Sequence, residues 1–247
     1  RRFLLQTAIL DRFNAPLCDA ITGQQDGSVQ LETLERGNFF IVPLDDKRHW
    51  YRYHHLFADV LAAHLRAEQP DQVARLHQRA SVWYEQNDLP SDAIHHALRA
   101  EDFQRAATLI ERAVPAMRRS RQESTLLGWL QALPNEIFHS RPVLSVHFAG
   151  TLLQSGRLDG VEARLSDAER WLGTMTDASD RPNASLADMI VVDEEAFRLL
   201  PGLVAMYRAA VALVRGNVAD TQKNARRTLE LAREDDHLLR GSASGLL

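Results

Sequence analysis

The sequence predicts a mainly α-helical protein in which a small α+β module precedes a long array of helix pairs. Two observations carry this prediction. Two short β-prone runs, residues 39–44 and 50–53, flank a charged turn and therefore predict a β-hairpin. After the hairpin, apolar residues recur at three- and four-residue spacing through most of the remaining chain, which is the period of amphipathic helices.

Three short helices are predicted before the hairpin. The first covers residues 3–10, and the second covers 15–21, with a proline near its start and Gly23 just past its end. Ser28 is the expected N-cap of the third helix, which closes at Gly37. Three short helices followed by a two-stranded wing is the element order of a winged helix, so residues 1–69 are interpreted as a winged-helix module.

A winged helix invites a DNA-binding interpretation, in which the third helix would enter the major groove. That helix carries Glu32, Glu35 and Arg36, and residues 1–69 hold eight Arg and Lys against nine Asp and Glu. Because contact with phosphates requires clustered positive charge, this module favours packing against protein over binding DNA.

A weak internal repeat organises residues 70–247, which we interpret as a tetratricopeptide-like sensor region. A turn residue is followed five and twelve positions later by small or compact side chains. Four turn residues start this pattern: Asp88, Glu101, Gly156 and Gly216. Small residues at those points let paired helices approach closely, and such arrays present concave surfaces to ligands or partner segments.

Further details of the array follow from local signals. Ser91 and Asp102 are predicted to cap two of its helices, and the last two helices are predicted at about 191–215 and 218–233. Residues 173–188 are rich in Asp, Ser, Thr, Ala and Pro without periodicity, so they are predicted to form an exposed flexible loop.

Composition sets the outer limits. The chain has 247 residues, a formal net charge of −4 and a single cysteine, Cys18, so an internal disulfide is excluded and a reducing cytoplasm is expected. No continuous apolar run long enough to span a bilayer is expected. The chain starts at Arg1 without an initiator Met, so we expect it to be a segment of a longer protein.

Several runs together resemble the MalT-like regulators, the large ATP-binding members of the LuxR family. The resemblance covers residues 3 to about 115, and the runs that carry it are residues 3–12, 15–20, 39–45, 50–57 and 93–98. It implies a signal-transduction ATPase with an N-terminal nucleotide-binding core, a winged helix, a tetratricopeptide-like arm and a C-terminal DNA-binding helix-turn-helix.

The resemblance implies that the chain is a regulatory segment and not an enzyme. No phosphate loop occurs, since neither Lys47 nor Lys223 follows a glycine, so ATP or ADP is expected only in the parent protein. The expected partners are the absent nucleotide-binding core and an inducer or regulatory protein on the arm. DNA is expected only through an absent helix-turn-helix, and no membrane is expected. The alternative is a protein-interaction scaffold of helical repeats without nucleotide coupling.

The resemblance also implies one site residue. In related signal-transduction ATPases a Met-His-Asp triplet meets the nucleotide, and its His contacts the ADP phosphate. Tyr53-His54-His55 stands in the matching place, with Met and Asp replaced. His54 is therefore the candidate ADP contact, because an imidazole near a helix start can donate to a phosphate oxygen. The alternative is that His54 caps the helix or packs against the wing.

No catalytic or metal site is expected from the remaining residues. The adjacent pairs His54-His55 and His95-His96 cannot chelate one ion from a regular helix, because neighbouring side chains point about 100° apart. His77 and His95 are expected at the polar margins of apolar helix faces. No Ser-His-Asp arrangement or pair of carboxylates stands out.

Overall fold

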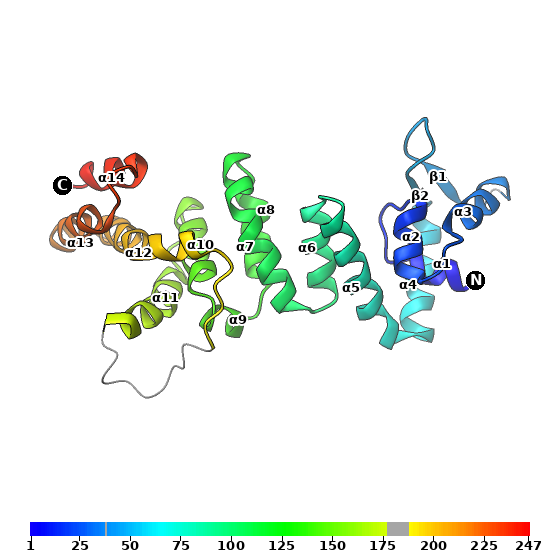
Figure 1. Cartoon of the computed structure of the whole chain (residues 1–247), viewed down its shortest axis with the longest axis horizontal. Helices are drawn as coiled ribbons and strands as arrows, with labels where there is room; N and C mark the ends of the chain where they lie inside the picture. Colours follow the sequence, from blue (N-terminus) through cyan, green and yellow to red (C-terminus); the bar gives the residue numbers. More distant parts are fainter. Residues whose placement is uncertain (38, 177–187) are drawn as a thin grey trace. The chain divides into compact units, whose positions relative to one another are not determined.

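A computed structural model describes residues 1–37, 39–176 and 188–247, and this part of the chain is mainly helical with one small antiparallel sheet (Figure 1). The chain forms two compact units, Arg1–Ala106 and Ala107–Leu247, called unit 1 and unit 2 below. The boundary predicted after residue 69 lies between the winged helix and the helical array, whereas the boundary between the two compact units lies further along the chain, after Ala106. Both the 1–69 and the 70–247 assignments remain predictions.

Unit 1 begins with the predicted order of elements, three short helices and then a hairpin. Strand pairing is antiparallel, with Ile41 opposite Tyr53. Phe13 extends the pairing by an isolated bridge to Tyr51, and its ring lies 4.6 Å from that of Tyr53 between centroids. The elements are α1 (Arg2–Thr7), α2 (Ala15–Thr22), α3 (Gly27–Arg36), β1 (Ile41–Pro43), β2 (Tyr51–Tyr53) and α4 (His55–Glu68).

The predicted cap of α3 is wrong by two residues. Asp26 occupies the N-cap position, and Ser28 lies inside the helix. The reason is a contact distant in sequence: the Gly27 N–H donates to Oδ1 of Asp19 at 2.7 Å. A Cβ at position 27 would lie 2.7 Å from that oxygen, so only glycine fits at the first residue of this helix.

A helix pair completes unit 1. Helices α5 (Pro70–Gln86) and α6 (Pro90–Arg99) pack side by side. Ser91 is not the cap of α6, because Pro90 already starts the helix, and proline suits the first helical position since it has no N–H to satisfy. Asp102 does cap the following helix, accepting the Arg105 N–H at 3.2 Å.

Unit 2 is built from further helix pairs, among which α10 packs on α11 and α12 packs on α13 (Figure 1). The helices that follow α6 are α7 (Phe103–Arg119), α8 (Glu123–Gln131), α9 (Asn135–His139), α10 (Pro142–Gln154), α11 (Val161–Thr176), α12 (Glu194–Val214), α13 (Val218–Leu231) and α14 (His237–Ser244). The loop predicted at about 173–188 falls mostly on 177–187, outside the described residues, and α11 continues to Thr176.

One core cluster joins α10, α11 and α12. Its buried members are Val143, Val146, Ala149, Leu152, Val161, Leu165, Ala168, Phe197, Leu200, Val204 and Val211. Helix α12 is long and apolar enough to cross a membrane by length and composition alone, although Arg198 and Arg208 interrupt its apolar residues. Its Leu200 and Val204 side chains are instead buried in this cluster, so they already pack against protein.

The same turn recurs between helices of the array. Five turn residues have φ between +54° and +74°: Asp88, Glu101, Arg121, Gly156 and Gly216. In every case the next residue's N–H donates to the carbonyl five positions before it, at 2.9–3.1 Å, which is the Schellman arrangement. Four of the five are the predicted turn residues. The tetratricopeptide-like assignment itself remains a prediction.

The positions that follow these turns are buried, as their spacing implies. Five and twelve residues after the turn stand Ala93 and Ala100, Ala106 and Ala113, Leu126 and Leu133, Val161 and Ala168, and Thr221 and Thr228. Only the turn at Arg121 is followed by leucines, and the pattern of small residues therefore did not predict it. In the pairs α5–α6, α10–α11 and α12–α13 this turn thus precedes a helix that packs against the one before it.

Candidate functional site

His54 lies where strand β2 passes into helix α4. Its backbone is fully engaged: the His54 N–H donates to the Phe40 carbonyl at 2.7 Å, and its own carbonyl accepts from Phe57 and Ala58, each at 2.9 Å. The residue occupies the N-cap position, but its side chain makes no capping hydrogen bond. His54 therefore caps α4 only through its backbone carbonyl, and its imidazole is exposed.

The exposed imidazole is accompanied by a second one. The rings of His54 and His55 lie 4.4 Å apart between centroids, at the N-terminal end of the 14-residue helix α4. Unpaired N–H groups and the helix dipole make such an end favourable for anions. The arrangement therefore offers donors for a phosphate group, whereas it offers no nucleophile or paired base.

Large apolar side chains are exposed next to His54. We call Phe39, Phe40, Leu56 and Val60 the wing surface; Phe40 is 60% exposed and Leu56 is 63% exposed. Leu56 and Val60 stand one turn apart on α4, and Phe40 packs its ring 5.2 Å from that of Phe57. A concentration of exposed apolar residues of this size is typical of a surface that contacts another protein or domain.

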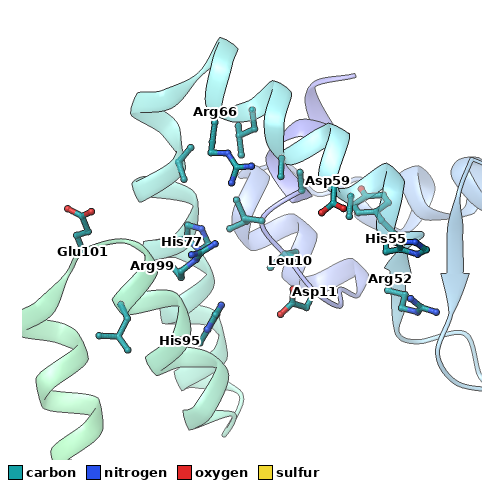
Figure 2. A pocket seen from close by; sticks show the side chains of 18 residues that line it. Leu10, Asp11, Arg52, His55, Asp59, Arg66, His77, His95, Arg99 and Glu101 are labelled. Atoms are coloured by element: carbon teal, nitrogen blue, oxygen red, sulfur yellow. The ribbon is translucent and has the colours of Figure 1, made fainter. Parts of the chain in front are cut away.

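A cleft of about 680 Å³ lies within unit 1, between the winged helix and the pair α5–α6 (Figure 2). Its walls come from residues 8–11, strand β2 and helices α4, α5 and α6. His55 lines this cleft, whereas His54 does not. Ala58, Ala62 and Leu65 give the α4 wall an apolar middle section.

Charged side chains surround the apolar section of the cleft. On the side nearer the helix pair lie Arg66 of α4, Arg99 of α6 and the Glu101 carboxylate; on the side nearer the sheet lie Asp59, Asp11 and Arg52 (Figure 2). In the part of the chain that the structure describes, neither Arg66 nor Arg99 forms a hydrogen bond or an ion pair. Arg66 and Arg99 are thus available to a ligand that enters the cleft.

Two imidazoles meet beneath the cleft. His77 on α5 and His96 on α6 are buried, with their Nδ1 atoms 2.7 Å apart, so one ring donates to the other. Burial, aided by the positive charge of Arg99, lowers the pKa of His77 to about 4. Burial and the neighbouring His77 lower the pKa of His96 to about 3. Both rings are therefore neutral at pH 7, and the expected marginal position of His77 is wrong.

His95, by contrast, is exposed, and it lines the cleft. Among the described residues no group of three or more His, Cys, Asp or Glu side chains is placed to hold a metal ion. The cleft and the His77–His96 contact have no local sequence signal, because their members come from separate helices.

Residues 1–73 match the family model described as the MalT winged helix domain. Residues 1–73 belong to the MalT winged-helix family. This assignment confirms the resemblance for the module that carries His54, the wing surface and most of the α4 wall of the cleft. It also fits the observed order of three helices, hairpin and helix.

Curated relatives extend the similarity beyond the MalT winged helix. The chain is 32% identical over 169 residues to the HTH-type transcriptional regulator MalT of Vibrio parahaemolyticus, covering 68% of this chain and 19% of that protein. It is 40% identical over 81 residues to MalT of Vibrio cholerae, covering 33% of this chain and 9% of that protein.

A relative of another class is similar to the same degree. The chain is 34% identical over 184 residues to the serine/threonine-protein kinase PknK of Mycobacterium tuberculosis, covering 72% of this chain and 17% of that protein. The chain thus spans less than a fifth of the length of each of these relatives.

Proposed function

We propose that this chain is a regulatory segment of a MalT-like transcriptional activator and performs no catalytic step itself. The observation that carries the proposal is the MalT winged helix at residues 1–73, with an exposed His54 and an exposed wing surface on one of its edges. Relatives named as MalT transcriptional regulators support the same class.

The wing surface would pack against a nucleotide-binding core located elsewhere in the parent protein. There His54 would donate a hydrogen bond to the phosphate of bound ADP, assisted by the positive end of α4. The side chain fits that role, since its imidazole is exposed and its backbone groups are already bonded. This contact would hold the parent protein in its ADP-bound resting state.

The helical array would receive an inducer or a regulatory protein and shift the equilibrium between resting and active arrangements. We propose that the parent protein acts in the cytoplasm and reaches DNA only through a separate C-terminal helix-turn-helix. In this scheme the chain couples the two events, because α4 of the winged helix packs directly on α5 of the first helix pair.

The decisive experiment uses the parent protein with the substitution His54→Ala. Loss of a charge-assisted hydrogen bond is expected to weaken ADP retention by about tenfold or more and to raise transcription without inducer. His64→Ala is the matched control, since His64 is an exposed histidine of the same helix. If both variants retain ADP like the wild type, the ADP contact of His54 is wrong.

A protein-interaction scaffold without nucleotide coupling is the second candidate. The observation in its favour is the 34% identity to PknK, a protein named as a kinase, over 72% of this chain. In this case partner binding to the parent protein would be the same with ADP, with ATP and without nucleotide. A change in partner affinity with the nucleotide would exclude the scaffold and favour the coupled regulator.

A further inference from the structure

We propose that the cleft of unit 1 is a binding site for a small phosphate monoester whose body carries hydroxyl groups. The proposal stands on the charges, shape and volume of the cleft, and it does not require His54 or any nucleotide-binding core. It assigns a specific ligand chemistry to the junction between the winged helix and the first helix pair.

The basic side of the cleft fits a phosphate group. Arg66 and Arg99 approach it from different helices, and neither has a hydrogen-bond or ion-pair partner among the described residues (Figure 2). The Glu101 carboxylate also lines this side, but it forms an ion pair with neither arginine. The charge of Arg99 reaches into the wall, because it helps to lower the pKa of His77. A phosphate monoester carries a charge between about −1.5 and −2 at pH 7. Two unpaired guanidinium groups therefore suit a phosphate ligand better than they suit a ligand with a single carboxylate.

An imidazole donor completes that side. His95 is exposed and lines the cleft near Arg99, while His77 forms part of the wall. In either tautomer the exposed His95 ring carries an N–H that can donate to a phosphate oxygen. Nδ1 of His77 is already engaged with His96, so His95 is the imidazole assigned to the phosphate.

The opposite side of the cleft fits hydroxyl groups. The Asp59 and Asp11 carboxylates line it and form no hydrogen bond or ion pair within the described part of the chain. Ionised carboxylates accept hydrogen bonds only, so Asp59 and Asp11 can bind hydroxyl donors, and Arg52 on the same side can donate to a hydroxyl oxygen. A ligand with one phosphate and a hydroxylated body is therefore favoured.

The size of the cleft limits the ligand further. A volume of about 680 Å³ falls within the range of about 300–1,000 Å³ usual for small-molecule pockets. Along α4 the lining side chains of Ala62 and Leu65 stand between Asp59 and Arg66 and give this wall an apolar section. A phosphorylated sugar or a nucleoside monophosphate would span the distance between Arg66 and Asp59, with its body over the apolar section.

The test uses the full chain and isothermal titration calorimetry with four probes: glucose 6-phosphate, adenosine monophosphate, inorganic phosphate and glucose. Saturable binding of at least one monoester, tighter than inorganic phosphate, with no binding of glucose, is the expected result. Arg66→Gln and Arg99→Gln should each weaken that binding by about tenfold or more. Asp59→Asn should weaken the monoester and leave inorganic phosphate unchanged.

Arg75→Gln is the matched control, because Arg75 is an exposed arginine of α5 that does not line the cleft. A thermal melt of each variant shows that it is folded, and imidazole NMR signals of His77 and His95 in the wild type report binding independently. The proposal is overturned if no monoester binds at millimolar concentration, if both arginine variants bind like the wild type, or if inorganic phosphate binds as tightly as the monoesters. His54→Ala should leave monoester binding intact. The cleft proposal and the ADP contact of His54 can therefore fail independently of each other.

Discussion

The Nδ1 atoms of His77 and His96 lie 2.7 Å apart inside the α5–α6 pair, and the ring of His96 stacks on Tyr84 with centroids 5.2 Å apart. Both imidazoles are buried, and a cation on either would face the other ring and the charge of Arg99. The contact is therefore compatible only with neutral rings, and it makes the helix pair sensitive to acid.

The first prediction concerns this acid sensitivity. Each ring has a folded-state pKa, about 4 for His77 and about 3 for His96, below the usual value of 6.5. Below pH 6.5 the unfolded chain binds protons that the folded chain does not, so their contribution to stability falls as pH falls. The stability advantage of the wild type over the double variant His77→Gln, His96→Gln should shrink by up to about 1.4 kcal/mol per pH unit per ring.

Urea unfolding between pH 7.5 and 4.5 measures this difference. The comparison with the variant is needed because Glu111 and His147 in unit 2 titrate in the same range in both proteins. Burial raises the pKa of Glu111 to about 7 and lowers that of His147 to about 3, with opposite effects on stability. A difference that stays constant over the whole range would show that the two rings are not buried as neutral partners.

The second prediction concerns the buried pair Glu111 and Arg141 of unit 2. Arg141 approaches the Glu111 carboxylate at 3.6 Å and donates to Oγ1 of Thr108 at 2.9 Å. Arg141→Met should cost about 3–5 kcal/mol in urea unfolding at pH 8, because it leaves a buried carboxylate without its cation.

The companion double variant supplies the control. Glu111→Leu combined with Arg141→Met removes both charges and should recover most of the lost stability. The cost of the single variant should also be smaller at pH 5, where the Glu111 carboxyl is protonated. A single variant as stable as the wild type at pH 8 would contradict the role given to this pair.

The third prediction compares two helical glycines. A Cβ at Gly150 in α10 would collide with the hydroxyl group of Tyr207 on α12, whereas nothing lies within 4 Å of a Cβ at Gly128 in α8. Gly150→Ala should destabilise the protein by about 1–3 kcal/mol through overpacking. Gly128→Ala should instead stabilise it by up to about 1 kcal/mol, because alanine favours the helix.

Thermal and urea unfolding of both variants test this comparison. Tyr207→Leu in the Gly150→Ala background should restore part of the loss, since it removes the hydroxyl and much of the ring from the contested space. Equal effects of the two glycine substitutions would mean that α10 and α12 are not in close contact at this point.

Local signals in the sequence predicted the elements that local chemistry determines. The β-prone runs around a charged turn gave the hairpin, and the glycine after α2 takes the left-handed conformation, with φ of 73° at Gly23. The predicted cap at Ser28 failed because a side chain eight residues away, Asp19, bonds to Gly27. No propensity or spacing rule contains that contact.

Of the candidate site, the sequence likewise predicted the part that a local motif encodes and not the part that tertiary packing forms. His54 was predicted from a short motif, and the structure places it exposed at the start of α4, while its contact with ADP remains a proposal. The cleft was not predicted, since Leu10 and Arg99 reach it from positions far apart in sequence. Its chemistry arises from packing between a winged helix and a helix pair, which periodicity within each element does not reveal.

The final prediction concerns the recurring turn. Arg121 has φ of 55°, although a side chain with a Cβ disfavours the left-handed region, and Gly156 serves the equivalent turn with φ of 69°. Arg121→Gly should therefore stabilise the protein by about 0.5–1 kcal/mol, and Gly156→Ala should destabilise it by about 1 kcal/mol. Arg121→Ala controls for loss of the side chain and should change stability little, because it keeps the Cβ. Urea unfolding of the three variants measures the effects; stabilisation by alanine as large as by glycine would show that the arginine side chain, and not the backbone conformation, limits this turn.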